Sequence, residues 1–353
     1  MAWRQRCLCS LTGLALALAG TAAEAGPYSG LYVFGDSLSD SGNVLSITGG
    51  APGGIPASAY YSDGPVVGRF TNGLNYIDRV AATLGLALTP STTGGTNYAF
   101  GGARATYARA DLAAYGALGF DKQVDRYLTD SGGVVDANAL YVLWIGSNDM
   151  SDGFGQALMA GGSLAPIGAA ATNAVTTLLT KFSTLEALGA RHFAIGTVPD
   201  LGLTPAVQEL AALYGDPGIA MLATGAAMAF NGALAASLPS FVAPGADVTL
   251  FDSFGLLRAV TADPLAYGLT DVADGCYNGQ VDGTPTPGAG PITLCANPDG
   301  YIYFDTEHPS ARAHQILADS LAAQLVPEPA GGWALTLGGL GLLGFMRRRP
   351  AAG

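Results

Sequence analysis

One stretch decides the fold of this 353-residue chain: Leu31-Tyr32-Val33-Phe34-Gly35-Asp36-Ser37-Leu38-Ser39-Asp40-Ser41-Gly42-Asn43. Its first four residues are apolar, with the β-branched and aromatic side chains that are typical of a buried strand. The glycine and the polar cluster that follow predict a turn, with Ser37 and Asp40 where a helix would begin. A hydroxyl at such a position lies close to free backbone N–H groups, which makes Ser37 a candidate nucleophile. A capped turn without a catalytic role could have the same sequence. The choice between a catalytic serine and a structural turn therefore depends on the rest of the chain.

Predicted strands and helices alternate along the chain. Apolar residues at helical spacing predict helices over 69–84, 120–128, 169–188, 205–238 (interrupted around 214–217) and 310–325. Short apolar runs predict strands at 97–100, 139–145, 192–198 and 248–251, and the run 139–145 is apolar enough to be covered on both faces. The alternation favours the α/β class, as one domain with a three-layer α/β/α sandwich and a mainly parallel sheet. The polar residues after 31–34, 97–100 and 139–145 should meet at the carboxyl edge of that sheet.

The candidate base is found near the carboxyl end, where Asp305 and His308 are three residues apart. At this spacing a carboxylate can orient the imidazole while the ring reaches a distant hydroxyl, which is the arrangement of a Ser-His-Asp triad. Glu307 is an alternative acid, but adjacent side chains point in different directions. The other two histidines have simpler interpretations. His192 opens an apolar strand, where a surface or packing role is expected. His314 lies inside the last helix, where a solvated or capping role is expected.

An acyl-transfer serine also needs hydrogen-bond donors at the position where negative charge develops on oxygen. Backbone N–H groups at Ser37 and in the Gly101-Gly102 turn can supply two, since glycine lets the backbone approach a ligand closely. The amide of Asn148, after the strand at 139–145, can supply a third. Gly102 and Asn148 are each equally compatible with an ordinary turn, and their significance lies in occurring together with Ser37 and the Asp305/His308 pair.

The chain resembles the GDSL (SGNH) hydrolase family over residues 30–325. The resemblance rests on four blocks in the order in which the family has them: Gly35-Asp36-Ser37-Leu38, Asn97-Tyr98-Ala99-Phe100-Gly101-Gly102-Ala103, Gly146-Ser147-Asn148-Asp149 and Asp305-Thr306-Glu307-His308-Pro309. It is closest to the branch that contains secreted bacterial lipases and esterases. One small departure is Ser147, where many members have glycine or another small residue.

The resemblance implies a flavodoxin-like SGNH-hydrolase fold and a serine hydrolase that cleaves carboxylic esters of small molecules or lipids. Ser37 would be the nucleophile, His308 the base and Asp305 the acid that orients it. The backbones of Ser37 and Gly102 and the side chain of Asn148 would form the oxyanion hole. Loop-holding roles are implied for Asp40, Asn43 and Asp149. No metal or organic cofactor is implied.

Both ends of the chain have the features of targeting segments. Residues 1–25 combine arginines, a short apolar core and Ala23-Glu24-Ala25, which predicts a secretory signal removed by signal peptidase. Residues 327–353 run from a Pro-Glu-Pro element through an apolar stretch to Arg347-Arg348-Arg349. This order resembles the PEP-type C-terminal sorting signal of Gram-negative exported proteins, which an exosortase-type enzyme processes after transient membrane anchoring. A plain membrane anchor is the alternative. The hydrolase domain would then span 26–326, and the protein would be extracellular or bound to the cell surface.

Charge and cysteine content narrow the class further. The net charge of −12 argues against nucleic acid as a partner. Cys276 and Cys295, in a Gly/Pro-rich loop, predict one disulfide in an exported chain. A metal site is the alternative for this pair, although no histidine or third cysteine accompanies it.

Three other functions fit parts of the sequence. An esterase that removes acetyl groups from extracellular polysaccharide would suit the predicted cell-surface location. A metal-dependent phosphoesterase could use Asp36 and Asn148-Asp149, but three histidines are few for its usual ligand set. A non-catalytic surface protein could have kept the fold. Finally, the aromatic loop 49–68 is a candidate wall for an acyl pocket.

Overall fold

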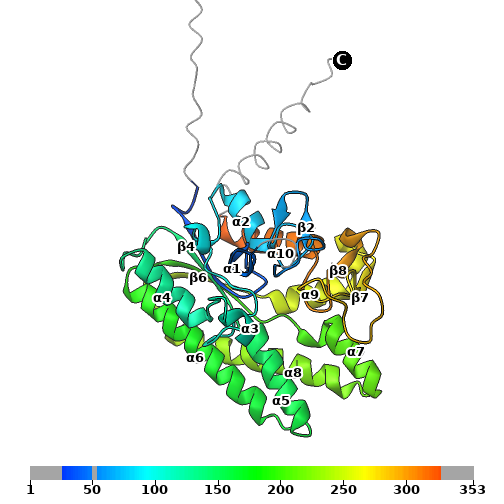
Figure 1. Cartoon of the computed structure of the whole chain (residues 1–353). Coiled ribbons are helices and arrows are strands. Elements are labelled where there is room, and N and C mark those ends of the chain that lie inside the picture. Colours follow the sequence, from blue (N-terminus) through cyan, green and yellow to red (C-terminus); the bar gives the residue numbers. More distant parts are fainter. Residues whose placement is uncertain (1–25, 50–53, 327–353) are drawn as a thin grey trace, which may run out of the picture.

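The computed structural model describes residues 26–49 and 54–326 (Figure 1). The predicted signal segment 1–25 and the predicted sorting tail 327–353 lie outside the described residues.

A parallel sheet forms the centre of the described structure. Its four strands are β1 (Leu31–Gly35), β4 (Leu140–Trp144), β5 (His192–Gly196) and β6 (Asp247–Phe251), in the order β1-β4-β5-β6. Every neighbouring pair is parallel, with Leu31 beside Leu140 and Leu140 beside His192. All four carboxyl ends therefore lie along one edge of the sheet.

Side chains that alternate along these strands feed two separate cores. Phe34, Tyr141 and Phe193 pack on one face against α4 (Phe120–Asp130), α5 (Ser147–Met159), α6 (Ala165–Ala187) and α8 (Gly218–Ser237). Val33 and Val142 pack on the other face against α2 (Tyr76–Leu84), α9 (Ser253–Ala262) and α10 (Ala311–Leu325). Figure 1 shows the two helical layers below and above the sheet. The predicted three-layer α/β/α sandwich with a mainly parallel sheet is confirmed.

Shorter elements complete the described structure. The helix α7 (Pro205–Tyr214) packs beside α8. The remaining helices and strands are α1 (Asn43–Thr48), α3 (Ala110–Ala113), β2 (Ser62–Asp63), β3 (Val66–Val67), β7 (Asp271–Gly275) and β8 (Tyr301–Tyr303). Single turns of 3₁₀ helix lie at Ser91–Thr93, Leu201–Leu203, Leu238–Ser240, Pro264–Tyr267 and Pro298–Gly300.

Three predicted elements need correction. The helix predicted over 69–84 begins only at Tyr76, because Asn75 and Asp78 form a capping box that fixes its start. The first helix after β1 begins at Asn43 rather than at Ser37 or Asp40. The segment 97–100 runs beside β1 but is no regular strand, because the carbonyl of Asn97 accepts hydrogen bonds from Ser91 and from the Asn43 side chain.

The sequence prediction also missed the short α3 and two longer helices, α5 and α9. α5 begins at Ser147, so Asn148 lies in the first turn of a helix rather than at the tip of a turn. α9 follows β6 after a single residue, and Asp252 caps it by accepting the N–H of Gly255. Polar and glycine residues dominate the start of α5, which hid its helical period.

Within the described residues, one helical stretch, Gly218–Ser240, is long and apolar enough in composition to cross a membrane. It packs against α5, α6 and α7, with Ala223, Ala227 and Phe230 buried in the core of the sandwich. A core helix of a layered protein has the same composition.

Cys276 and Cys295 form a disulfide between positions 19 residues apart. The loop that it closes is paired with the end of β8, because the N–H of Cys276 donates to Tyr303 and that of Tyr277 donates to Phe304. The disulfide therefore fastens this loop beside the strand that leads into Asp305.

We expect the double variant Cys276→Ala/Cys295→Ala to lose about 3 kcal/mol of unfolding free energy, because the open loop regains conformational entropy in the unfolded chain. Urea unfolding with and without a reducing agent measures the effect. The reducing agent should destabilise the wild type to the level of the variant and leave the variant unchanged. The expectation would be contradicted if the unfolding free energy of the wild type did not change after its disulfide had been reduced, as shown by the appearance of free thiols.

Candidate active site

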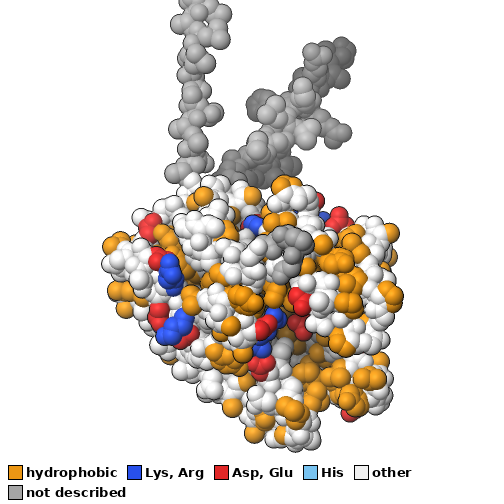
Figure 2. Space-filling model, in the orientation of Figure 1, with side chains coloured by type: hydrophobic (Ala, Val, Ile, Leu, Met, Phe, Trp, Pro, Cys, Tyr) orange, Lys and Arg blue, Asp and Glu red, His pale blue; other side chains and the backbone are white. Residues whose placement is uncertain are grey.

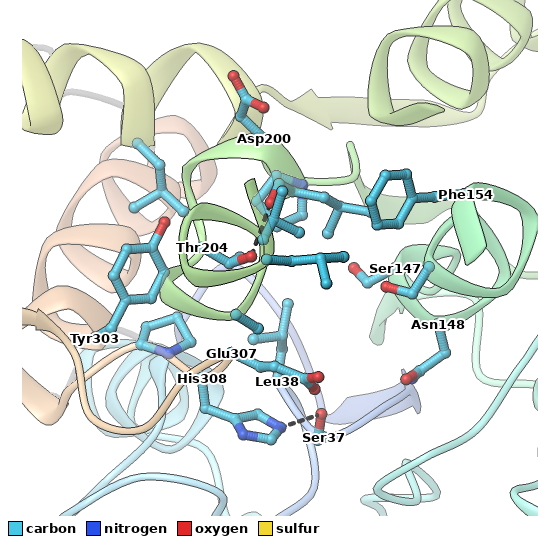
Figure 3. Close-up of a pocket in the computed structure, with 18 of the residues that line it drawn as sticks. Ser37, Leu38, Ser147, Asn148, Phe154, Asp200, Thr204, Tyr303, Glu307 and His308 are labelled. Atoms are coloured by element: carbon cyan, nitrogen blue, oxygen red, sulfur yellow. Dashed lines mark hydrogen bonds between the residues drawn. The ribbon is translucent and has the colours of Figure 1, made fainter. Parts of the chain in front are cut away.

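Ser37 lies in the turn after β1, just beyond the carboxyl edge of the sheet. The turn is held by Asp36, whose Oδ1 accepts the N–H of Leu38 at 3.1 Å. The two other serines of the stretch are occupied, because the hydroxyl of Ser39 bonds to Tyr76 and that of Ser41 donates to Asp78. Ser37 instead faces an open cavity (Figure 3).

The imidazole of His308 joins Ser37 to Asp305. Nε2 of His308 lies 2.9 Å from Oγ of Ser37, and its Nδ1 lies 2.7 Å from Oδ2 of Asp305. Asp305 and His308 are both buried, in the loop between β8 and α10. The structure thus brings together the three residues predicted as nucleophile, base and orienting acid. The carboxylate of Glu307 is exposed and has no hydrogen bond to His308 among the described residues.

Asp305 is held by more donors than the sequence indicated. Its Oδ1 accepts the backbone N–H groups of Glu307 and His308, each at 2.7 Å. Its Oδ2 accepts a hydrogen bond from the hydroxyl of Tyr61, also at 2.7 Å, on the same oxygen that faces His308. Tyr61 is fully buried and packs edge-on against Phe304. Sequence reasoning missed this contact, and the only signal was an aromatic pair, Tyr60-Tyr61, in a loop of glycine, proline and serine.

The network shifts the pKa values of its two ionisable members apart. Burial alone would lower the pKa of His308, but the charge and hydrogen bond of Asp305, with Glu307 and Asp36, outweigh it and raise the pKa above 6.5. Burial would raise the pKa of Asp305, yet the charge of His308 and the two backbone N–H groups hold it below 3.8. Asp305 is therefore ionised whenever His308 titrates.

A second buried carboxyl, Asp36, lies directly beside Ser37. Burial raises its pKa to about 6, partly offset by the N–H of Leu38 and the charge of His308. Its Oδ2 is buried and has no hydrogen-bond partner among the described residues. This orphan oxygen explains why ionisation of Asp36 is unfavourable.

The three predicted oxyanion donors converge with His308 on one cavity, which Ser37, Gly102 and Asn148 all line. The backbone N–H groups of Ser37 and Gly102 donate to no other group in the described part of the chain. Asn148 donates one amide hydrogen to the carbonyl of Ala103 at 3.0 Å, which orients the amide and leaves its second hydrogen available. Gly102 has a φ of 74°, a conformation that an L-residue with a side chain rarely adopts.

The residues expected to hold loops do so through buried hydrogen bonds. Asp40 accepts the N–H groups of Gly42 and Asn43 on Oδ1 and those of Val44 and Gly101 on Oδ2. The side chain of Asn43 donates to the carbonyls at 97 and 99. Asp149 accepts the N–H of residue 105. A further residue missed from the sequence is Gln123 on α4, whose side chain bonds both the N–H and the carbonyl at position 35.

Two cavities meet at Ser37, His308 and Asn148. One, of about 330 Å³, opens between α5 and α7 and is mainly apolar. The other, of about 280 Å³, contains Arg104, Arg109 and Asp152. The suggestion that loop 49–68 forms an acyl pocket is wrong for its described part, since none of residues 54–68 lines either cavity. Packing directs this loop against Phe304 and Asp305 instead.

The other histidines lie away from this network. His192 is half-buried at the start of β5, beside the ring of Tyr28, in agreement with the packing role expected for it. His314 is buried rather than solvated, and its Nδ1 accepts the N–H of Tyr76 at the start of α2. Burial, with the charges of His308 and Arg79, lowers the pKa of His314 to about 3. Among residues 26–49 and 54–326, no cluster of three or more His, Cys, Asp or Glu side chains is placed to hold a metal ion.

Comparison with known proteins gives a consistent result. A family profile described as GDSL-like Lipase/Acylhydrolase matches residues 31–321. "Lipase 1" of Photorhabdus luminescens is 36% identical over 194 residues, which covers 53% of this chain but only 25% of that protein. A GDSL esterase/lipase of Arabidopsis thaliana is 27% identical over 347 residues, covering 87% of this chain and 91% of that protein.

Two of the solved structures that match are from Streptomyces. Phospholipase A1 from Streptomyces albidoflavus NA297 matches with a TM-score of 0.39 and 14% identity, over 86% of this chain and 100% of that chain. An extracellular lipase from Streptomyces rimosus matches with a TM-score of 0.36 and 16% identity, over 85% of this chain and 100% of that chain.

The contact between Tyr61 and Asp305 predicts how the pKa of His308 responds to mutation. In the wild type, NMR titration of the imidazole should give a pKa above about 6.5. Tyr61→Phe should raise it further, because more negative charge on Oδ2 of Asp305 is left to stabilise the imidazolium. Asp305→Asn should lower it.

Tyr60→Phe is the matched control, because this neighbouring ring packs at a tilt against Tyr277 and makes no hydrogen bond to Asp305. It should leave the titration of His308 unchanged. Assignment is feasible with three histidines in the chain, of which His314 should stay neutral between pH 5 and pH 8. A pKa of His308 that falls, or stays constant, in Tyr61→Phe would show that Tyr61 does not act on the base.

Proposed function

We propose that this chain, which belongs to the GDSL-like lipase/acylhydrolase family and is an ester hydrolase, cleaves carboxylic esters through an acyl-enzyme on Ser37. One observation carries the proposal: the continuous hydrogen-bonded line from Oγ of Ser37 through His308 to Asp305. Each member is oriented by the next, which is the geometry that nucleophilic acyl transfer needs.

In the first half of the reaction, Oγ of Ser37 attacks the ester carbonyl carbon while Nε2 of His308 takes the hydroxyl proton. The carbonyl π pair moves to oxygen, and the resulting oxyanion accepts hydrogen bonds from the N–H groups of Ser37 and Gly102 and from the Asn148 amide. These donors are already fixed before the substrate binds, so no reorganisation is needed when charge develops. When the C–O bond breaks, the proton on His308 passes to the departing alkoxide.

In the second half, His308 takes a proton from water, and the hydroxide oxygen attacks the acyl carbon. Collapse of the second tetrahedral intermediate breaks the bond to Oγ, and His308 returns the proton to Ser37. Asp305 stays ionised throughout and stabilises the imidazolium that forms twice. Residues of this chain and water carry every proton in this scheme, so the proposed mechanism requires no cofactor.

A fluorophosphonate probe tests the acyl-enzyme proposal directly, because it phosphonylates an activated serine. The wild type should be labelled at one site that mass spectrometry maps to Ser37, and Ser37→Ala should not be labelled. Ser46→Ala is the matched control, since Ser46 is an exposed serine of α1 with no contact to His308. An unlabelled wild type, or equal labelling of Ser37→Ala, would contradict the proposed mechanism.

We also propose that the protein is exported from a Gram-negative cell and reaches the surface or the surrounding matrix. Support comes from the order of basic, apolar and small residues in 1–25 and from the Pro-Glu-Pro, apolar and arginine order in 327–353. The disulfide between Cys276 and Cys295 suits an oxidising compartment. Signal peptidase and an exosortase-type enzyme would be the processing partners.

Expression of the full chain in a Gram-negative host that has an exosortase tests this proposed location. The mature protein should begin at Gly26, should lack the arginine cluster, and should be found outside the inner membrane. Amino-terminal sequencing and intact mass measure both cuts. A protein that retains residues 1–25 and stays in the cytoplasm would refute export.

A further inference from the structure

We infer that the natural substrate is an ester of a long, unbranched acyl chain with a polar alcohol, and that the chain lies in a groove along α5. This inference deepens the proposed function and rests on it. It is carried by two connected apolar cavities that begin at Ser37 and end at the surface between α5, α7 and α8.

The inner cavity begins at the nucleophile. Its volume of about 330 Å³ falls within the range of roughly 300–1,000 Å³ for small-molecule sites. Figure 3 shows the side chains of Leu38 and Phe154 on its walls, with Ser37 and His308 at one end. Further apolar walls come from Leu201, Val207, Leu210 and Leu257.

An outer cavity of about 840 Å³ continues the inner one. Gly155, Leu158 and Leu210 line both cavities, so they mark the junction between them. Gly155 has no neighbour within 4 Å of the position where a Cβ would lie. The junction is therefore open because this residue of α5 has no side chain.

The groove follows one face of α5. Asn148, Ser151, Gly155 and Leu158 are spaced by three, four and three residues, so they lie on the same side of the helix. From Asn148 to Leu158 the helix rises about 15 Å. An extended saturated chain advances about 1.25 Å per carbon, given C–C bonds of about 1.52 Å and angles near 111°. The face of α5 therefore accommodates an acyl chain of roughly a dozen carbons.

Charged groups near the groove are neutralised or lie at its ends. Asp200 is buried beside the inner cavity but is paired with Arg258 and accepts hydrogen bonds from Gly202 and Thr224. Asp216 lies at the outer end, where its Oδ1 accepts the N–H of residue 218. Glu307 lines the inner cavity only at its Ser37 end, where it is exposed to solvent and also borders the second cavity. A hydrocarbon chain that runs from there toward Leu158 can thus lie in the groove without burying an unpaired charge.

The second cavity at Ser37 has the opposite character. It contains two arginines, Arg104 and Arg109, and two carboxylates, Asp152 and Glu307. Arg104 is fixed by a bidentate pair with Asp152 at 2.8 Å. Arg109 is likewise paired with Asp111. Because both arginines are neutralised by carboxylates, this side suits an uncharged or zwitterionic polar alcohol. The contrast between the two cavities separates a hydrocarbon part of the ester from a polar part, and our inference takes the hydrocarbon part to be the acyl chain.

Apolar side chains continue beyond the outer cavity onto the surface. Met159 is 84% exposed and Tyr214 is 71% exposed, and both line the outer cavity. Leu213 and Met221, on α7 and α8, are also exposed. Figure 2 shows hydrophobic side chains gathered over this part of the molecule. An acyl chain longer than the groove would therefore continue over apolar surface rather than end against a wall.

Chain-length selectivity tests the inference on the unmodified protein. Each methylene that enters the groove should raise kcat/KM by a factor of up to about four. For p-nitrophenyl esters below their aggregation limits, we expect kcat/KM for the dodecanoate to exceed that for the butanoate at least tenfold. A wild type that cleaves the acetate or butanoate as well as the dodecanoate would overturn the inference and leave the serine mechanism standing.

Gly155→Leu tests the position of the chain, because its side chain would project into the open junction. The ratio of kcat/KM for dodecanoate to that for butanoate should fall at least tenfold. Gly168→Leu is the matched control, since Gly168 is an exposed helical glycine of α6 that also has nothing within 4 Å and lines neither cavity. The ratio should be unchanged in this control. Equal ratios in Gly155→Leu and the wild type, or an equal fall in both variants, would overturn the assignment.

A binding measurement separates this inference from the proposed mechanism. Ser37→Ala should gain thermal stability with dodecanoic acid but not with butanoic acid, because a ligand that binds only the folded state raises Tm. The added substitution Gly155→Leu should remove the gain, and Gly168→Leu should keep it. If fluorophosphonate labelling fails while this shift is observed, the mechanism is wrong and the groove assignment holds. If labelling succeeds and no shift is observed with dodecanoic acid, the groove assignment is wrong.

Discussion

One buried carboxylate, Asp40, holds together the two backbone segments of the proposed oxyanion site. Its four hydrogen bonds join the turn after β1 to the turn at Gly101, which lies about sixty residues further along the chain. Burial raises the pKa of Asp40 to about 6, because it disfavours the charged carboxylate. The backbone N–H groups act in the opposite direction, since their hydrogen bonds stabilise that charge. Because Gly101 precedes Gly102, fixing its N–H also fixes the next peptide beside Ser37. The two proposed backbone donors, at Ser37 and Gly102, are therefore held together by this carboxylate as well as by the end of β1.

The neighbouring carboxyls show how a partner decides the charge of a buried acid. Asp305 and Asp36 are both fully buried, yet the pKa of Asp305 is lowered and that of Asp36 is raised to about 6. Asp305 accepts two backbone N–H groups, the hydroxyl of Tyr61 and the imidazole of His308, whereas Oδ2 of Asp36 has no partner among the described residues. In such a setting an acid of fixed charge orients the base, while an acid of variable charge only modulates its surroundings.

The sequence predicted the layers, the parallel sheet and the proximity of Ser37, Gly102 and Asn148 from local patterns at strand ends. The addition of Asp305 and His308 to this site rested on their spacing and on the resemblance to the GDSL family. The sequence prediction failed where tertiary contacts decide. Tyr61 reaches Asp305 only because the loop that carries it packs on Phe304. Helix α5 was missed because glycine and polar residues at its start obscure the apolar period. Of the two roles expected for His314, the solvated one is wrong, because its ring is buried. The ring does accept an N–H at a helix start, but that helix is α2, a contact between helices that no local pattern encodes.

The missed helix is also the one that connects chemistry to substrate shape. Asn148 lies in the first turn of α5, and Gly155 and Leu158 lie further along the same face. A helix is rigid over this length, so the wall of the groove and the amide that faces the oxyanion have a fixed relation to each other. A chain bound along α5 therefore places its carbonyl carbon at a defined distance from Asn148 and Ser37. Binding energy gained far from the reacting bond is thereby available to orient it, which is how remote contacts contribute to rate as well as to affinity.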